Sequence, residues 1–183
     1  MKFKYGLLNM IFGPIKDEKI IEQIKEKYRN NGDFQQLLIF LLSINTGLRV
    51  NEVLSLKVKD VKNKTCINIK NGIAVILSEE IRDIISEQVK NKRLNDWLFR
   101  TKSDNQMARV QVHRKFREIC DELGYTLYSI ISWSKTFAYF YYQNTKDIGF
   151  LQWYFNQPSA EMALDYIDEP MNMADRFQQV VAL

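Results

Sequence analysis

Cysteine and histidine are scarce in this sequence, which limits the chemistry that the chain can carry. It contains two cysteines, Cys66 and Cys120, and one histidine, His113. The cysteines lie far apart and have no further cysteine or histidine at metal-ligand spacing, and His113 has no cysteine, aspartate or histidine at useful spacing. We therefore expect no metal site, no cofactor, and two packed thiols in place of a structural disulfide.

Long apolar runs are also missing. No stretch of about eighteen apolar residues is available to cross a bilayer. The N-terminal segment MKFKYGLLNMIFG lacks the small-residue cleavage site of a signal peptide. We therefore expect a cytoplasmic protein without a membrane partner. Repeats, low-complexity tracts and linkers are absent too, and 183 residues with 46% hydrophobic content predict one domain over residues 1–183.

Charge of one sign is not in large excess. The chain has 26 Lys and Arg against 22 Asp and Glu, for a net charge of +4, which predicts only a mild attraction to nucleic acid. Positive residues are concentrated in KVKDVKNK (residues 57–64) and in residues 90–117. Either segment could contact phosphate, and the alternative is a solvated charged face.

Hydrophobic spacing predicts a mostly helical chain. We expect helices over residues 17–32, 33–45 and 50–61, and later over residues 79–92, 106–123, 129–143, 146–155, 159–167 and 173–181. Between these groups, β-branched TCINIK and IAVILS are separated by Asn-Gly, the strongest short hairpin signal. The order of helices, one small antiparallel hairpin and further helices predicts an α+β domain that is mostly α.

Aromatic residues gather in ISWSKTFAYFYY, residues 131–142. They could form a surface on which bases stack, or a buried helix face. Phe137, Phe140 and Tyr141 share one helical face, which favours burial.

Two further segments resemble conserved boxes of the tyrosine recombinases, the phage integrase family. NTGLRVNEVLSLKVKDV resembles the first box, which places Arg49 where the family has an arginine that grips the scissile phosphate. The hairpin follows at the family's distance, slightly shorter than usual, and Lys70 matches the catalytic lysine. LQWYFNQPSAEMALDYI resembles the last box and places Tyr166 at the position of the nucleophile. The match resembles the catalytic-domain-only members, without a DNA-clamping domain before it.

The aromatic stretch resembles the remaining family box, of the form His-x-x-Arg, then His or Lys, then Thr-Phe. KTF at residues 135–137 matches it, but Ile131 stands at the histidine position and Ser134 at the position of the second phosphate-binding arginine. Downstream, Gln157 stands where the family has His or Trp. The resemblance therefore implies a degenerate active site that retains Arg49, Lys70 and Tyr166.

These substitutions weaken the chemistry that the family performs. Tyrosine recombinases transfer a phosphodiester onto a tyrosine oxygen without a metal, and a phenol with a pKa near 10 is a poor nucleophile at neutral pH. Positioned cations must therefore stabilise the transition state, and a serine cannot replace a planar guanidinium. By analogy with other phosphoryl transfers, one missing arginine costs roughly 10³ to 10⁵ in rate. Lys135 is one residue away from the required position and is a poor substitute.

Three functions remain open at this point. The favoured one is a catalytically inactive, tyrosine-recombinase-like protein that binds double-stranded DNA as a regulator, for example a repressor, or as an accessory factor of a phage or other mobile element. The second is a weakly active site-specific recombinase, and the third is a protein-interaction module that acts on another recombinase. A C-terminal helix at about residues 172–183 could be exchanged between protomers, so a homo-oligomer on DNA is expected. The candidate DNA-binding residues are Arg49, Lys57, Lys59, Lys62, Lys64, Lys70, Arg109, Arg114 and Lys135.

Overall fold

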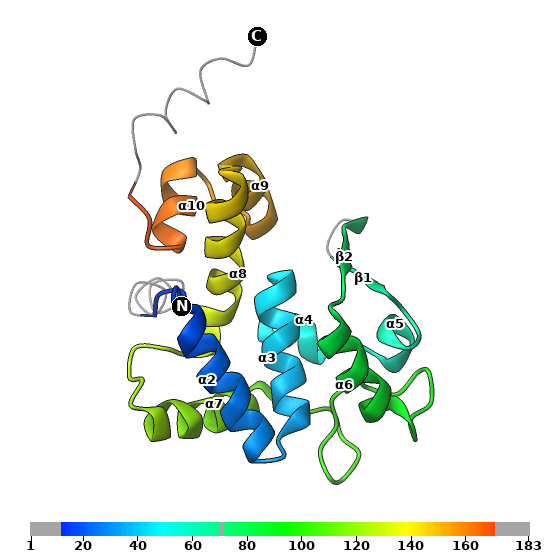
Figure 1. Ribbon diagram of the computed structural model, residues 1–183. Helices are drawn as coiled ribbons and strands as arrows, with labels where there is room; N and C mark the ends of the chain where they lie inside the picture. The colour runs from blue at the N-terminus through cyan, green and yellow to red at the C-terminus, as the bar shows by residue number, and fades with distance from the viewer. Residues whose placement is uncertain (1–11, 70–71, 171–183) are drawn as a thin grey trace.

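Helices make up most of the computed structural model, which describes residues 12–69 and 72–170 (Figure 1). The first part of the chain forms α2 (Glu18–Asn30), α3 (Phe34–Thr46), α4 (Val50–Leu54) and α5 (Val58–Val61). The antiparallel strands β1 (Cys66–Asn68) and β2 (Ala74–Ile76) follow. The chain then forms α6 (Glu79–Val89), α7 (Arg109–Leu123), α8 (Ile130–Thr145), α9 (Ile148–Phe155) and α10 (Ala160–Tyr166). The prediction of a mostly helical α+β fold with one small hairpin is confirmed.

Two predictions fall outside the described residues. They are the tip of the hairpin with Lys70, and the C-terminal helix at about residues 172–183. The hairpin itself has the register Cys66 with Ile76, Ile67 with Val75 and Asn68 with Ala74.

No described helix combines the length and the apolar character needed to span a membrane. Among residues 12–69 and 72–170, no group of three His, Cys, Asp or Glu is placed to hold a metal ion.

The core has two parts, and α8 contributes to both. The larger part surrounds α3, where Trp133 of α8 packs edge-on against Phe40 and Phe116, at ring-centroid distances of 5.3 and 4.9 Å. The smaller part lies between the end of α8, α9 and α10 and includes the buried Tyr142 and Leu164. Figure 1 shows α8 rising from the lower helices to the pair α9 and α10.

The aromatic stretch is confirmed as part of these packed regions. Trp133 and Tyr142 are buried, and the other rings of residues 137–141 are partly buried. Cys120 lies in the larger core, where burial raises the pKa of its thiol to about 12, and Cys66 is partly buried on β1. Both cysteines are free.

Gly47 fixes how the first part of the fold meets α8 and α9. It ends α3 in the left-handed conformation, with φ 72°, and its backbone N–H donates to the Ser43 carbonyl. A Cβ at this position would lie 2.5 Å from Cδ1 of Phe137 and 2.9 Å from Cε1 of Tyr154. Only glycine suits both the conformation and the close approach, which carries the following Arg49 toward α8 and α10.

Candidate functional site

Tyr166, the last residue of α10, lies against α8. Its hydroxyl is 3.0 Å from the hydroxyl of Ser134, and the two groups form a hydrogen bond. Its ring packs against Phe155 of α9, with centroids 5.0 Å apart. Ser159 begins α10 because its side chain accepts from the N–H of Met162. Tyr166 and Ser134, to which the family resemblance assigned the positions of the nucleophile and the second arginine, are thus in direct contact.

Lys135 comes from the interior side of the same site. Its side chain is only 1% exposed, and its Nζ lies 5.3 Å from the centroid of the Tyr166 ring. Burial lowers the pKa of Lys135, an effect that the negative charge of Asp168 opposes. Because its side chain is enclosed, Lys135 does not lie on a surface that DNA could contact directly, unlike the other described cations predicted to bind it.

Arg49 precedes α4 and approaches Tyr166 from this part of the fold. It is exposed, and its backbone N–H donates to Oε2 of Glu52 at 2.7 Å, which begins the helix. The guanidinium is close enough to Tyr166 to influence its ionisation through charge and hydrogen bonding.

The pKa of Tyr166 reflects this setting. Burial raises the pKa above its ordinary value, and the hydrogen bond from Ser134 and the charge of Arg49 lower it without reversing the shift. The carboxylate of Glu52 acts in the same direction as burial. The phenol is therefore neutral at physiological pH and is harder to ionise than a free tyrosine.

The other substituted positions lie around this contact. Ile131 is partly buried in the first turn of α8, one turn before Ser134. Gln157 lies in the turn between α9 and α10, where its backbone N–H donates to the Gln152 carbonyl at 2.8 Å. The structure thus brings together Arg49, Ser134, Lys135 and Tyr166, whereas Lys70 lies outside the described residues.

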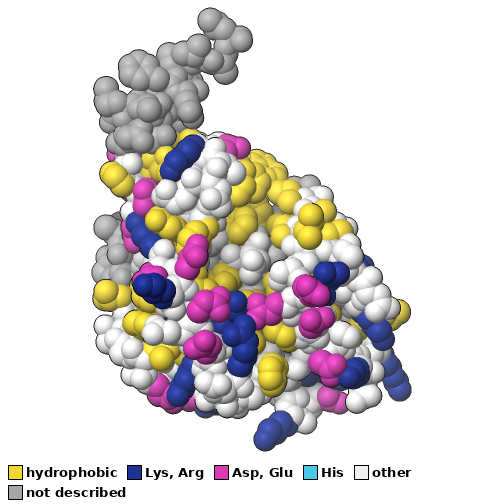
Figure 2. All heavy atoms as spheres, in the orientation of Figure 1, with side chains coloured by type: hydrophobic (Ala, Val, Ile, Leu, Met, Phe, Trp, Pro, Cys, Tyr) yellow, Lys and Arg dark blue, Asp and Glu magenta, His cyan; other side chains and the backbone are white. Residues whose placement is uncertain are grey.

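The remaining predicted DNA contacts are distributed over several elements. Lys59 and Lys64 are exposed, Lys62 is partly buried, and Lys57 extends over the ring of Trp97, with Nζ 5.2 Å from the centroid. On α7, Arg109 and Arg114 are exposed, and Arg114 is 3.9 Å from Glu118. Figure 2 shows acidic and basic side chains intermixed over the lower part of the visible face and hydrophobic ones gathered above. Local groups must therefore supply any affinity for DNA.

Two residues at the site, Tyr154 and Glu52, are not among the site residues predicted from the sequence. Tyr154 donates its hydroxyl to the carbonyl of Thr46 at 2.7 Å, which ties α9 to the end of α3 beside Arg49. Burial raises the pKa of Tyr154 well above its usual range, with Glu52 adding to the shift and Arg49 opposing it. Glu52 is visible in the sequence only as part of a helix start, because its approach to both tyrosines depends on the packing of α4 against α3.

Comparison with known families and sequences gives a consistent result. A model of the phage integrase family matches residues 16–173. Over 163 residues the chain is 31% identical to the probable integrase/recombinase YoeC of Bacillus subtilis (strain 168). This match covers 86% of the chain and 90% of the relative.

Solved structures share the fold at lower identity. The XerA recombinase superposes with a TM-score of 0.69 at 22% identity over 92% of this chain. The XerH site-specific recombinase bound to its difH substrate in a pre-cleavage complex gives 0.70 at 18% identity over 94% of this chain. A lambda integrase dimer bound to a COC' core site gives 0.59 at 15% identity over 88% of this chain. The chain spans 64%, 55% and 51% of the lengths of these three proteins.

Proposed function

Because the chain belongs to the phage integrase family, we propose that it binds double-stranded DNA through the tyrosine recombinase fold without cleaving it. In this proposal it acts as a regulator, for example a repressor, or as an accessory factor of a phage or other mobile element. It works as a homo-oligomer on DNA, since one catalytic-type domain grips only one face of a duplex.

The contact between Ser134 and Tyr166 carries the proposal. A hydroxyl occupies the position of the second arginine, and it is bonded to the tyrosine at 3.0 Å. A serine supplies no positive charge to the phosphoryl group in the transition state, whereas a guanidinium can hold two of its oxygens. Among the described residues at this place, Arg49 is the exposed cation that can receive a phosphate, which suffices for binding but leaves the transition state without its second clamp.

The electrostatics of Tyr166 point in the same direction. Attack on phosphorus requires the phenol to lose its proton, and burial raises the pKa of Tyr166. The Glu52 carboxylate adds to this effect and also opposes the approach of a phosphate. The tyrosine is therefore better suited to a neutral hydrogen bond than to nucleophilic attack.

DNA binding is supported by the relatives and by the exposed cations. XerH and the lambda integrase dimer are both bound to their DNA sites in the structures that share this fold. Arg49, Lys59 and Lys64 are exposed in the present structure. Lysine and arginine contacts to the phosphate backbone give an affinity that falls with salt.

An electrophoretic mobility shift with fragments from the genomic neighbourhood of the gene tests the proposal. Wild type and Tyr166→Phe should shift the same fragment equally, whereas Arg49→Ala should bind about tenfold more weakly, the typical value of one charged contact. Lys19→Ala, which removes an exposed charge on α2, is the matched control and should bind as wild type does. Wild-type affinity no better than that of an unrelated protein of equal pI would contradict the proposal.

A second candidate, a weakly active site-specific recombinase, has its own support. Arg49 influences Tyr166 directly, Lys135 adds a cation 5.3 Å from its ring, and the relative YoeC is described as a probable integrase/recombinase. A covalent protein–DNA adduct on a nicked substrate, lost in Tyr166→Phe, would favour this candidate over the first.

A further inference from the structure

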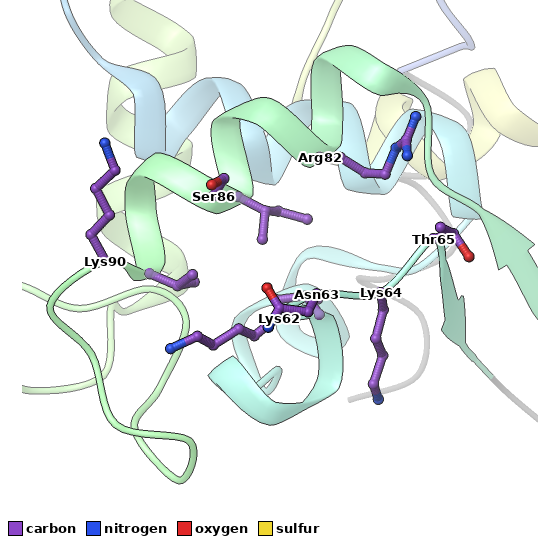
Figure 3. Close-up of a pocket in the computed structure, with 10 residues that line it drawn as sticks. Lys62, Asn63, Lys64, Thr65, Arg82, Ser86 and Lys90 are labelled. Carbon is purple, nitrogen blue, oxygen red and sulfur yellow. The ribbon is translucent and has the colours of Figure 1, made fainter.

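A basic pocket lies outside the site just described, between α6 and the turn that joins α5 to β1 (Figure 3). Its volume is about 380 Å³. The turn contributes Lys62, Lys64 and Thr65, and α6 contributes Arg82, Ser86 and Lys90. These two segments are separated in the sequence by the hairpin, and the hairpin brings them together because Thr65 directly precedes β1 and α6 follows β2.

The charge of this pocket is of one sign. Four of its ten lining residues are cationic and none is acidic. Lys90 pairs with Glu87 at 2.7 Å, but in the part of the chain that the structure describes, Lys62, Lys64 and Arg82 form no ion pair. Three cations therefore face solvent around one concavity without a counter-charge.

The opposite face of α6 shows that this imbalance is local. There Glu80 pairs with Arg29 and, at 3.2 Å, with Lys25, so two cations of α2 have an acidic partner across the helix interface. On α6, Glu80 therefore pairs with α2, whereas Arg82 lines the pocket. The cations of the two segments thus stand around the rim of one hollow, with the ends of Lys64, Arg82 and Lys90 pointing outward (Figure 3).

Neutral donors and the floor of the pocket suit an anion as well. The hydroxyls of Thr65 and Ser86 line the pocket, and within residues 12–69 and 72–170 neither is engaged in a side-chain hydrogen bond. The floor is formed by the buried Val61, Ile85 and Val89. An apolar floor lowers the local dielectric and strengthens the attraction between the surrounding cations and an anion.

We propose that this pocket binds phosphates of the DNA backbone, as a second contact that is separate from the site around Arg49 and Tyr166. The proposal rests on the proposed function, because it takes DNA as the ligand. No aromatic side chain lines the pocket, so nothing there would stack on the base of a free nucleotide. In Figure 3 the side chains of Lys64 and Arg82 lie on opposite sides of the pocket and their ends point away from each other, an arrangement that suits separate backbone phosphates better than one enclosed phosphate group.

The test compares two variants that remove the same charge. Lys64→Gln with Arg82→Gln removes two pocket cations, and Lys19→Gln with Lys102→Gln removes two exposed cations elsewhere. All four residues are exposed, so neither variant should disturb the core. The probe is the genomic duplex shifted by wild type, or a random duplex of about 30 base pairs if several fragments shift alike, since phosphate contacts are sequence-independent.

Each phosphate contact contributes about 0.9 to the slope of log K against log salt. The pocket variant should therefore lose about 2 from this slope and on the order of 10- to 30-fold in affinity at about 0.15 M salt, and the control variant should lose neither. Phosphate ethylation interference should show two groups of critical phosphates with wild type. The pocket variant should lose one group, and Arg49→Ala should lose the other.

The outcomes separate the two proposals. If wild type binds DNA and the pocket variant keeps both the slope and the footprint of wild type, the pocket proposal is overturned and DNA binding stands. Equal losses in the pocket and control variants would also overturn it, because net charge alone would explain them. If wild type does not bind duplex DNA, both proposals fall together.

Discussion

The hydroxyl of Ser134 illustrates how one substitution changes a site in two ways. Under our proposal it stands where the family has a charged arginine, and its hydroxyl gives the Tyr166 hydroxyl a partner at 3.0 Å inside the protein. A neutral hydrogen bond of this kind contributes about 1 kcal/mol to stability. The position that would assist cleavage instead helps to hold α10 against α8.

A double-mutant cycle measures this contact. Ser134→Ala and Tyr166→Phe should each destabilise the fold by about 1 kcal/mol, and their coupling energy should also be about 1 kcal/mol, because each change removes the same hydrogen bond. Ser132→Ala is the control, since its hydroxyl accepts from the N–H of Ser129 and should not couple to Tyr166. Urea unfolding gives all the values. A coupling near zero for Ser134 would show that the two hydroxyls do not interact in solution.

Lys135 provides a test of the buried side of the site. Burial lowers its pKa from the usual 10.5, so between the folded and unfolded pKa values the unfolded chain binds more protons. The contribution of Lys135 to stability therefore improves as the pH rises through that window. Lys135→Met removes the ammonium group whose charged form burial disfavours, so its effect on stability should be more favourable at pH 7 than at pH 10.

Unfolding by urea at the two pH values checks this expectation, with Lys19→Met as an exposed control that should show no pH-dependent difference. An equal gain from Lys135→Met at both pH values would mean that the lysine is solvated. It could then reach a phosphate, and the second candidate function would gain support.

The end of α3 connects the helices of the larger core to the site. Gly47→Ala should cost about 3 kcal/mol, because a positive φ costs about 1 kcal/mol and the new methyl group overlaps the rings of Phe137 and Tyr154. Gly32→Ala is a matched control, since Gly32 has φ 68° but nothing within 4 Å of its Cβ position. It should cost only about 1 kcal/mol in urea unfolding. Equal losses of stability in Gly47→Ala and Gly32→Ala would show that the close approach of Gly47 to α8 and α9 does not affect the free energy of unfolding.

A clasp between the two ends of the described chain holds the segment that follows Tyr166. Nζ of Lys16 donates to the carbonyl of Asp168 at 2.7 Å and to Oε1 of Glu169 at 2.8 Å. Because Lys16 and Glu169 are partly exposed and their ion pair is screened by solvent, Lys16→Met should change global stability by less than about 1 kcal/mol. It should nevertheless speed hydrogen exchange at the amides of Ile167 and Glu169, whereas Lys90→Met, which breaks an exposed pair on α6, should not. Unchanged exchange at both amides would contradict the clasp.

The elements differ in how well the sequence predicts them. Helical periodicity and the Asn-Gly signal are local, so the helices and the hairpin could be predicted. The start of α2 is a local feature of the same kind, because the Asp17 side chain accepts from the N–H of Lys19. The pocket that Arg82 and Lys64 both line could not be predicted from the sequence. Arg82 lies within an acidic stretch of α6, and the two residues come to line one pocket only when the hairpin has formed. The family resemblance supplied the positions of Ser134 and Tyr166, but their hydrogen bond depends on how α8 and α10 pack.

In the whole molecule, charge is almost balanced and intermixed on the face that Figure 2 shows. A net charge of +4 is too small to hold DNA at physiological salt by itself. Our account therefore places the affinity in a few groups, Arg49 and the cations around the basic pocket, and places the lack of cleavage in the pair Ser134 and Tyr166. Binding and cleavage can then be separated in one experiment.

The most direct measurement mixes the protein with a nicked duplex of the fragment that it shifts, and divides each sample between a native and a denaturing gel. Our account predicts a retarded complex in the native gel and no covalent adduct in the denaturing gel, for wild type and Tyr166→Phe alike. A denaturation-resistant adduct that forms with wild type and disappears in Tyr166→Phe would contradict the account and identify the protein as a working recombinase.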